Sequence, residues 1–365
     1  MKIPLIRPAI GKEEFENIKK VLKSGFLTQW KITKKFEKEF AKFVGAKYAI
    51  ATTSCTASLH LSMMEFIKRN EEVILPSFTF PACANVILAV GGIPVFCDID
   101  LESFTIDVNK IEDKINDKTK AIMPVHLAGH SADLHPIMKI AKKYKLKVIE
   151  DAACGIGVKY KNKHVGTFGV VGCFSFHPRK LLTTGEGGMI VTNQKNVYED
   201  LCSLKNHGRA VTSSMKFERV GLNYRMSDIL AAIGIAQLKK IRNIIKKRVE
   251  LAKYYTELLN EIKEIRTPII KSYSNHTFQS YIILLKKRGI RDKLMLYLRK
   301  KGIETQIGTF AVHLQPAYRK YVKEKLPNSE YAFKNSLILP LYHTMKYQEI
   351  EYVVKNIKDF LRRKN

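Results

Sequence analysis

The residues best suited to chemistry lie between Phe174 and Met189, where the sequence reads FSFHPRKLLTTGEGGM. The β-branched and aromatic residues leading into this stretch predict a buried strand that ends at Pro178. Lys180 follows, and three glycines then turn the chain into a second apolar run. We expect such a lysine to be partly desolvated, which lowers the pKa of its amine and leaves it able to form a Schiff base. The alternative is a surface lysine in a glycine-rich turn.

The string SFHPxK followed by TTGEGG closely resembles the Schiff-base segment of the DegT/DnrJ/EryC1/StrS family, the sugar aminotransferases that use pyridoxal 5′-phosphate (PLP). Further matches are Ser54–His60 (S-[GC]-T-A-x-L-H), Val125–Asp133 (VHLxGxxAD) and Gly221–Met226 (G-x-N-x-R-M). The resemblance covers nearly the whole chain. It implies the PLP-dependent transferase fold type I, as in aspartate aminotransferase, with Lys180 as the catalytic lysine that holds PLP.

A PLP enzyme also needs a carboxylate beside the pyridine nitrogen, to keep that nitrogen protonated. Asp151 is our candidate, in the segment VIEDAA at the end of an apolar strand. An ionised group there is costly unless it is paired, and a pyridinium would be its partner. The alternative is a cap for the next helix. Glu150 is expected to point to the opposite side of the strand.

The phosphate of PLP is expected at the start of a helix. Cys55, Thr56 and Ala57 open this helix directly after Ser54. Backbone N–H groups at a helix N-terminus, with hydroxyl groups beside them, suit a dianionic phosphate. An ordinary Ser or Thr helix cap is the alternative. The resemblance implies that Ser175 adds a hydroxyl to the same phosphate.

The resemblance also implies three further cofactor contacts. Phe80 is expected to stack on the pyridine ring, whereas Phe78 fits the protein core better. Asn223 reaches the phosphate from the partner subunit, unless it is a helix cap. Cys154 lies three residues after Asp151, where the family most often has Gln or His. That residue usually makes a hydrogen bond near the ring hydroxyl of the cofactor.

The amino-acid composition limits which classes of binding partner and which cellular compartment fit this protein. The formal net charge is +29, but the lysines are spread along predicted helix faces, which argues against nucleic acid and favours attraction of a polyanionic small substrate. Six cysteines without a CxxC pair indicate free thiols in a reducing cytoplasm. No apolar run approaches the ~20 residues of a membrane span, and no signal peptide is recognisable. No His or Cys spacing predicts a metal site.

Alternating strands and helices must position these residues. This alternation predicts a mostly parallel, seven-stranded sheet covered on both faces, with ligands at the carboxyl ends of its strands. We divide the chain into a large PLP-binding α/β domain, residues 1–245, and a small C-terminal α+β domain, residues 246–365. The seven expected strands are Tyr48–Thr52, Glu72–Leu75, Pro94–Cys97, Ala121–Val125, Lys147–Ile149, Gly172–Phe176 and Met189–Thr192, with helices that include Val108–Lys114 and Ser227–Leu259.

The predicted reaction is the transfer of an amino group, with L-glutamate as donor, to a keto group of a nucleoside diphosphate sugar in amino-sugar or polysaccharide biosynthesis. Arg225 and Arg179 are candidate anchors for the glutamate carboxylate. The phosphate contact from a partner implies a homodimer with shared active sites. Two alternatives stay open. One is a PLP-dependent sugar dehydratase, whose members typically have His in place of Lys180, and the other is a non-catalytic regulatory or sugar-binding relative.

Overall fold

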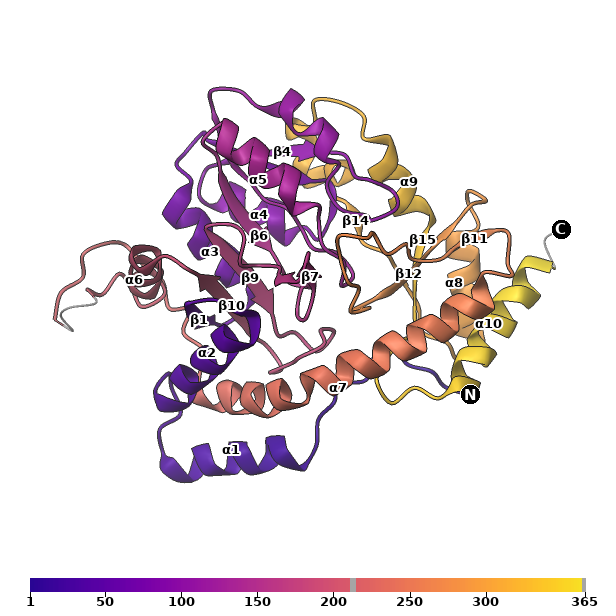
Figure 1. Cartoon of the computed structure of the whole chain (residues 1–365), viewed down its shortest axis with the longest axis horizontal. Helices are drawn as coiled ribbons and strands as arrows, with labels where there is room; N and C mark the ends of the chain where they lie inside the picture. The colour runs from indigo at the N-terminus through magenta and orange to yellow at the C-terminus, as the bar shows by residue number, and fades with distance from the viewer. Residues whose placement is uncertain (211–214, 363–365) are drawn as a thin grey trace.

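The computed structural model describes residues 1–210 and 215–362. Its centre is a seven-stranded sheet in which only β10 runs antiparallel to its neighbours (Figure 1). The strands are almost entirely buried because helices cover both faces of the sheet. In order across the sheet the strands are β1 (Tyr48–Thr52), β10 (Gly188–Thr192), β9 (Val171–Ser175), β6 (Lys147–Asp151), β5 (Thr119–Ile122), β2 (Glu72–Pro76) and β4 (Ile93–Cys97).

The predicted α/β class and all seven predicted strands are confirmed, with strand ends that differ by up to three residues. The helix predicted over Val108–Lys114 is wrong. This segment forms two separate 3-10 turns, Val108–Lys110 and Glu112–Lys114. Seven residues are too few to propagate a stable α-helix, and the Asp107 carboxylate accepts the N–H of Asn109 in a tight local turn.

The helices form two layers around the sheet. One face packs against α3, α4 and α6, and the opposite face packs against α2, α5 and the first half of α7, with α1 lying on α7 (Figure 1). These helices are α1 (Lys12–Ser24), α2 (Lys31–Val44), α3 (Cys55–Phe66), α4 (Ala82–Ala89), α5 (Leu134–Lys143), α6 (Lys195–Leu204) and α7 (Asp228–Leu259).

Helix α2 begins without a capping side chain of its own, because Trp30 occupies the N-cap position. The Asp228 carboxylate from the start of α7 replaces the cap. It accepts the backbone N–H groups of Trp30 and Thr33 at 2.8 and 2.9 Å, and the Thr33 hydroxyl at 2.6 Å. A buried carboxylate at a helix N-terminus satisfies both the free N–H groups and the helix dipole. The long helix α7 therefore fixes where α2 starts.

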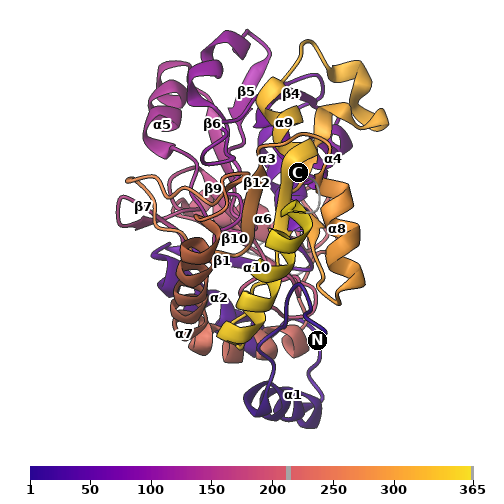
Figure 2. The same ribbon diagram turned by 90° about the vertical axis from the view of Figure 1, so that its right-hand side faces the viewer.

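The C-terminal part has its own antiparallel sheet and core (Figure 2). Ile3 lies in this core and pairs with Ile303, so the first residues of the chain pack with the last part. Helix α7 runs through residue 245 without a break, and the division of domains at that residue stays a prediction. The elements are β11 (Ile265–Arg266), β12 (Tyr281–Leu285), β15 (Ser336–Leu339), β13 (Gln306–Ile307), α8 (Arg291–Lys300) and α10 (Tyr347–Arg362).

Short elements join the two parts. Strand β14 (Phe310–Ala311) pairs with β3 (Phe78–Thr79), and α9 (Pro327–Asn335) packs against both. The remaining elements are the hairpin β7 (Lys159–Tyr160) with β8 (Lys163–His164) and the 3-10 turns Val312–Leu314 and Pro316–Tyr321.

Within residues 1–210 and 215–362, no helix combines the length and the apolarity that a membrane crossing requires.

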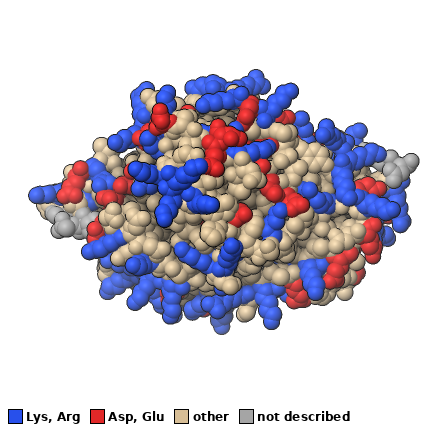
Figure 3. Space-filling view, turned by 45° about the horizontal axis from the view of Figure 1, so that its top comes forward, with Lys and Arg blue, Asp and Glu red and all other residues tan. Residues whose placement is uncertain are grey.

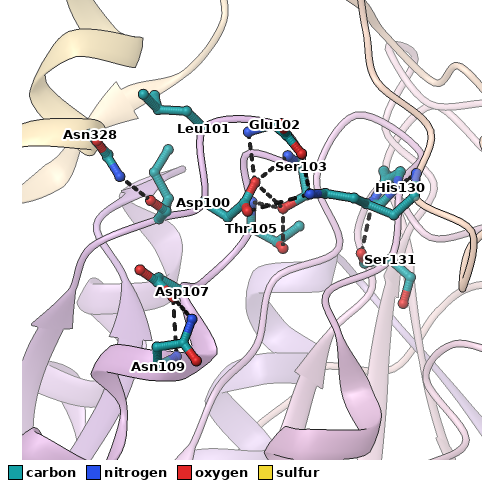
Figure 4. A network of polar contacts seen from close by, with 12 residues as sticks. Asp100, Leu101, Glu102, Ser103, Thr105, Asp107, Asn109, His130, Ser131 and Asn328 are labelled. Carbon is teal, nitrogen blue, oxygen red and sulfur yellow. Dashed lines mark hydrogen bonds and ion pairs between the residues drawn. The ribbon is translucent and has the colours of Figure 1, made fainter.

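A polar network strengthens this junction beyond the end of β4 (Figure 4). The Asp100 carboxylate accepts the N–H groups of Glu102 and Ser103 at 2.7 and 2.8 Å, and Lys271 forms ion pairs with Asp100 and Glu102. The Asn328 amide donates to the Ile99 carbonyl at 2.8 Å. Because Lys271 and Asn328 come from the C-terminal part, the network holds that part against the edge of the large sheet.

Candidate active site

A cavity of about 500 Å³ opens where the parallel strands end. Residues that directly follow β5, β6 and β9 line it, together with the start of α3 after β1. The opposite wall comes from the C-terminal part of the chain. This is the edge of a parallel sheet at which ligands are expected. Among the sequence-predicted site residues, those that line the cavity are Cys55, Thr56, Phe80, Asp151, Cys154, Ser175, Arg179 and Lys180.

Lys180 is partly buried and faces Cys154, to whose sulfur its Nζ donates at 3.1 Å. Burial by itself lowers the pKa of Lys180. The negative electrostatic influence of Cys154, the hydrogen bond to it and the charge of Asp151 outweigh burial, so the pKa of Lys180 is raised above its ordinary value. The lowered pKa expected from the sequence is therefore wrong. Apolar neighbours were visible in the sequence, but the two polar partners were not.

Asp151 ends strand β6 and is only 5% exposed. Its Oδ1 accepts the N–H of Ala153 at 2.9 Å, and its Oδ2 accepts the thiol hydrogen of Cys83 at 2.9 Å. No helix follows it, because residues 152–157 form turns, and the alternative of a helix cap is wrong. A buried carboxylate with so few donors is well placed to take a further cationic partner from the cavity.

Glu150 points to the other side of β6, as predicted. Its carboxylate accepts the N–H groups of Gly166, Phe168 and Gly169 at 2.6 to 2.7 Å and lies 3.0 Å from His126 Nε2. Burial raises the pKa of Glu150, but these hydrogen bonds and His126 hold it below its ordinary value. Since His126 Nδ1 accepts a backbone N–H, its Nε2 carries the proton. The His126 ring, which lines the cavity, is thereby fixed.

The start of α3 forms one end of the cavity. Ser54 is the N-cap and its Oγ accepts the N–H of Ala57 at 3.0 Å, so Ala57 has no free N–H to offer and does not line the cavity. Cys55 and Thr56 do line it. A Cβ on Gly188 would lie 2.4 Å from the Ser54 backbone, so glycine is required where β10 passes beneath this helix start.

Phe80 and Asn223 differ in their placement. Phe80 lies on the rim of the cavity with 62% of its surface exposed, whereas Phe78 is fully buried, as predicted. Asn223 is exposed and lies outside the cavity of its own chain, where its backbone pairs with Asn206. The structure therefore does not bring Asn223 to the other site residues within one chain.

The far wall of the cavity could not be predicted from the sequence. Gln279, Gln306 and Thr309 line it from the C-terminal part, and the Arg179 guanidinium contacts the Gln306 side chain. Gln279 and Gln306 lie in no recognisable motif. Thr309 lies in the segment Ile307–Pro316, which resembles the family, but the sequence gives it no role. All three are about a hundred or more positions from Lys180, so no local signal places them beside it. Cys83 was also missed, because a cysteine that contacts a carboxylate 68 positions away leaves no trace in sequence spacing.

Basic side chains are spread over the face of the molecule that Figure 3 shows and do not gather there in one stripe. The chain has 63 Lys and Arg against 34 Asp and Glu. Figure 3 shows Lys and Arg side chains over the whole visible face, with smaller groups of acidic residues between them. Such a field attracts anions in general. Within the described parts of the chain, no group of three or more His, Cys, Asp or Glu side chains is arranged to hold a metal ion.

Comparisons with known proteins agree with the sequence motifs. GDP-perosamine synthase of Escherichia coli O157:H7 is 37% identical, over 98% of each chain. The aminotransferase TlmJ of Streptoalloteichus hindustanus has a TM-score of 0.94 at 29% identity, over 99% of each chain. The E. coli GDP-4-keto-6-deoxy-D-mannose-3-dehydratase, solved with bound hydrated PLP, has a TM-score of 0.91 at 27% identity, over 98% of this chain and 99% of that one.

These likenesses span both the large sheet and the C-terminal part, and they confirm the predicted fold as that of PLP-dependent aminotransferases. The family model matches residues 8–358, which is nearly the whole chain. The chain therefore belongs to the DegT/DnrJ/EryC1/StrS aminotransferase family.

Proposed function

We propose that this protein binds PLP in the cavity and transfers an amino group from L-glutamate to a keto group of a nucleoside diphosphate sugar. One observation carries the proposal: Lys180 and Asp151 face the same cavity, which also contains the start of helix α3. An amine, a carboxylate and a helix N-terminus are the three groups that an aldehyde, a pyridine nitrogen and a phosphate require.

The residues present fit PLP. The pocket of about 500 Å³ is large enough for the cofactor and part of a substrate. Asp151 has room for a cationic partner, and the Gly188 cradle keeps the helix start close to the sheet. Thr56 and Ser175 offer hydroxyls at the same end. PLP, when bound, supplies an electron sink that stabilises negative charge at the α-carbon of an amino acid.

The protein's own residues would handle protons and orientation. Lys180 Nζ takes the proton from the α-carbon of the amino donor and later returns one to the amino-sugar carbon. Cys154 keeps this amine in place, since it lies 3.1 Å from Nζ. Asp151 holds the proton on the ring nitrogen through its charge. The Phe80 ring on the rim would be available to stack on the pyridine ring.

The substrate class follows from family membership and charge. The names of two similar proteins refer to GDP-linked compounds, and the positive field of this chain suits a diphosphate. Arg179 is the better anchor for the glutamate carboxylate within one chain, because it lines the cavity. Arg225 does not, and its Nη1 instead donates to the Asn206 side chain at 2.6 Å. Arg225 would contribute only across a subunit interface.

The presence of Lys180 favours aminotransfer over the alternatives. In sugar dehydratases that resemble this chain, His typically replaces the lysine, and a histidine cannot form the same link to the cofactor. A regulatory or sugar-binding relative would have no need of Lys180, Asp151 and the α3 end together in one cavity.

We also infer a homodimer with shared sites. Asn223 is exposed and outside the cavity, and the same segment exposes Phe217 by 60% and Val220 by 86%. Exposed apolar side chains next to a residue without a role in its own chain fit a subunit interface. Asn223 would then contact the phosphate in the partner's cavity.

All six cysteines are free thiols, which fits a reducing cytoplasm as the compartment.

The test is a pair of half-reactions followed by cofactor absorbance. The purified holoenzyme is first exposed to L-glutamate, and the aminated form is then given a panel of nucleoside diphosphate keto-sugars and matched free sugars. We expect glutamate to change the spectrum and one class of nucleotide-linked keto-sugar to restore it, whereas free sugars do not. A spectrum that glutamate leaves unchanged would refute the amino donor. Release of ammonia with loss of a sugar hydroxyl would favour the dehydratase.

A further inference from the structure

Cys83 contacts the carboxylate of Asp151 from beneath. This cysteine lies in the first turn of α4, is fully buried and donates its thiol hydrogen to Asp151 Oδ2 at 2.9 Å. The Thr79 hydroxyl lies 3.4 Å from the same sulfur. The other carboxylate oxygen, Oδ1, is held by the N–H of Ala153. Two donors on opposite oxygens define the rotation of the carboxylate plane.

The surroundings of Cys83 favour its protonated thiol, which is the form that can donate a hydrogen bond. Burial raises the pKa of Cys83 well above its ordinary value, and the charge of Asp151 and the hydrogen bond to it raise it further. A protonated thiol whose sulfur lies 2.9 Å from a carboxylate oxygen points its hydrogen at that oxygen. Because a thiol is a weaker donor than a hydroxyl, the carboxylate keeps most of its negative charge for another partner.

One loop links this contact to the rim of the cavity. The backbone N–H of Cys83 donates to the Phe80 carbonyl at 3.2 Å, so Phe80 and Cys83 belong to the same turn. Strand β3, just before this turn, is held by β14 of the C-terminal part. The residue at the ring face and the residue behind Asp151 are therefore placed by a single rigid segment.

We propose that Cys83 is a positioning residue, which orients the Asp151 carboxylate toward the pyridine nitrogen of PLP and leaves it the charge to keep that nitrogen protonated. The inference rests on the proposed function, since it takes PLP as the ligand. It predicts that the presence of a donor at position 83 affects cofactor binding more than the choice between a thiol and a hydroxyl.

The first experiment measures S–H stretching bands by infrared spectroscopy on the cofactor-free protein. A thiol that donates to a carboxylate has a lower S–H frequency than a thiol without such a partner. We expect Cys83→Ala to remove the lowest-frequency band and Asp151→Asn to move it upward. The matched control is Cys97→Ala, because Cys97 is also buried but its sulfur only lies 3.8 Å from the Asp107 carbonyl. If the lowest-frequency S–H band is unchanged in Cys83→Ala, the hydrogen bond from Cys83 to Asp151 is refuted.

The second experiment measures the PLP dissociation constant of cofactor-free variants. We expect Cys83→Ala to weaken binding about tenfold, as for the loss of one hydrogen bond to a charged group. Cys83→Ser should restore binding to within about threefold of the original protein, because its hydroxyl also donates. In the Asp151→Asn background, Cys83→Ala should change the affinity little. Equal affinity of Cys83→Ala and Cys97→Ala would overturn the positioning role.

The outcomes separate this inference from the proposed function. If the original protein does not bind PLP, the proposed function fails, whereas the infrared test of the Cys83 contact still stands on its own. If the original protein binds PLP and Cys83→Ala binds it equally well, only the inference fails. Should Cys83→Ala not fold, Cys83→Ser decides: retained affinity agrees with a donor role, and a loss as large as that of Asp151→Asn contradicts it.

Discussion

Asp151 and Asn223 were both assigned to the cofactor from sequence motifs, yet the structure treats them in opposite ways. Asp151 ends a central strand, is 5% exposed and has a donor on each carboxylate oxygen. Asn223 is exposed, lies outside the cavity and pairs through its backbone with Asn206. A single chain can orient a residue at a strand end, whereas Asn223 gains a role only if a second chain approaches.

The largest expected effect comes from removing the amine of Lys180, which faces the same cavity as Asp151. Lys180→Ala should abolish amino transfer, because no other lysine lines the cavity within the described residues. The protein should keep its fold, since Lys180 makes one side-chain hydrogen bond and is not part of a hydrophobic cluster. The measurement is turnover with borohydride trapping of PLP, and the exposed Lys163→Ala is the control. Turnover by purified Lys180→Ala at the rate of the control would contradict the assignment.

Loss of the Asp151 carboxylate should reduce the rate of amino transfer nearly as much. Asp151→Asn keeps the shape but removes the charge that holds the ring nitrogen protonated, and we expect a loss of about 10²–10³ in kcat. Thermal unfolding checks that the fold is intact. Asp107→Asn, at a local turn away from the cavity, serves as the control. Activity within a few-fold of the original protein would show that Asp151 has no electrostatic role in the reaction.

A mixing experiment tests whether Asn223 acts in the active site of a partner subunit. Asn223→Ala should weaken PLP retention about tenfold by the loss of one hydrogen bond to a charged group. Refolded together with Lys180→Ala, it should give hybrid dimers with one doubly damaged site and one intact site. The mixture should then exceed the summed activity of the two variants. If hybrids form, as shown by a tag on one variant, and no activity returns, Asn223 acts within its own chain.

The smallest expected effect is the salt dependence of substrate binding, which reports on the net positive charge of the chain. The apparent affinity for the nucleotide-sugar should fall several-fold between low salt and about 0.3 M salt, because ions screen the field beyond ~10 Å at ~0.1 M. A neutral osmolyte at matched osmolality is the control. An affinity that does not change with ionic strength would limit the charge of +29 to solubility or stability.

Much of the large sheet could be predicted from the sequence because its strands are continuous apolar runs between glycine, proline and polar turns. Gly188–Thr192 has this character and begins at the end of the TTGEGG segment, whereas Lys147–Asp151 has apolar residues only at its centre and ends in the VIEDAA segment. The segment Val108–Lys114 could not be predicted in the same way. Its helical spacing is real, but it is too short for spacing to outweigh the local turn at Asp107.

The sequence by itself determined the family and the α/β class, and it indicated Lys180 and Asp151 as candidate site residues, because each of these inferences depends on neighbours within a few positions. Only the tertiary structure decided what surrounds them. The pKa of Lys180 rises because Cys154 and Asp151 approach it, and Asp151 is oriented by Cys83, which lies 68 positions away. Desolvation can be inferred from an apolar segment, but hydrogen bonds and charges act over a few ångströms of space. Which residues supply them is known only once the chain has folded.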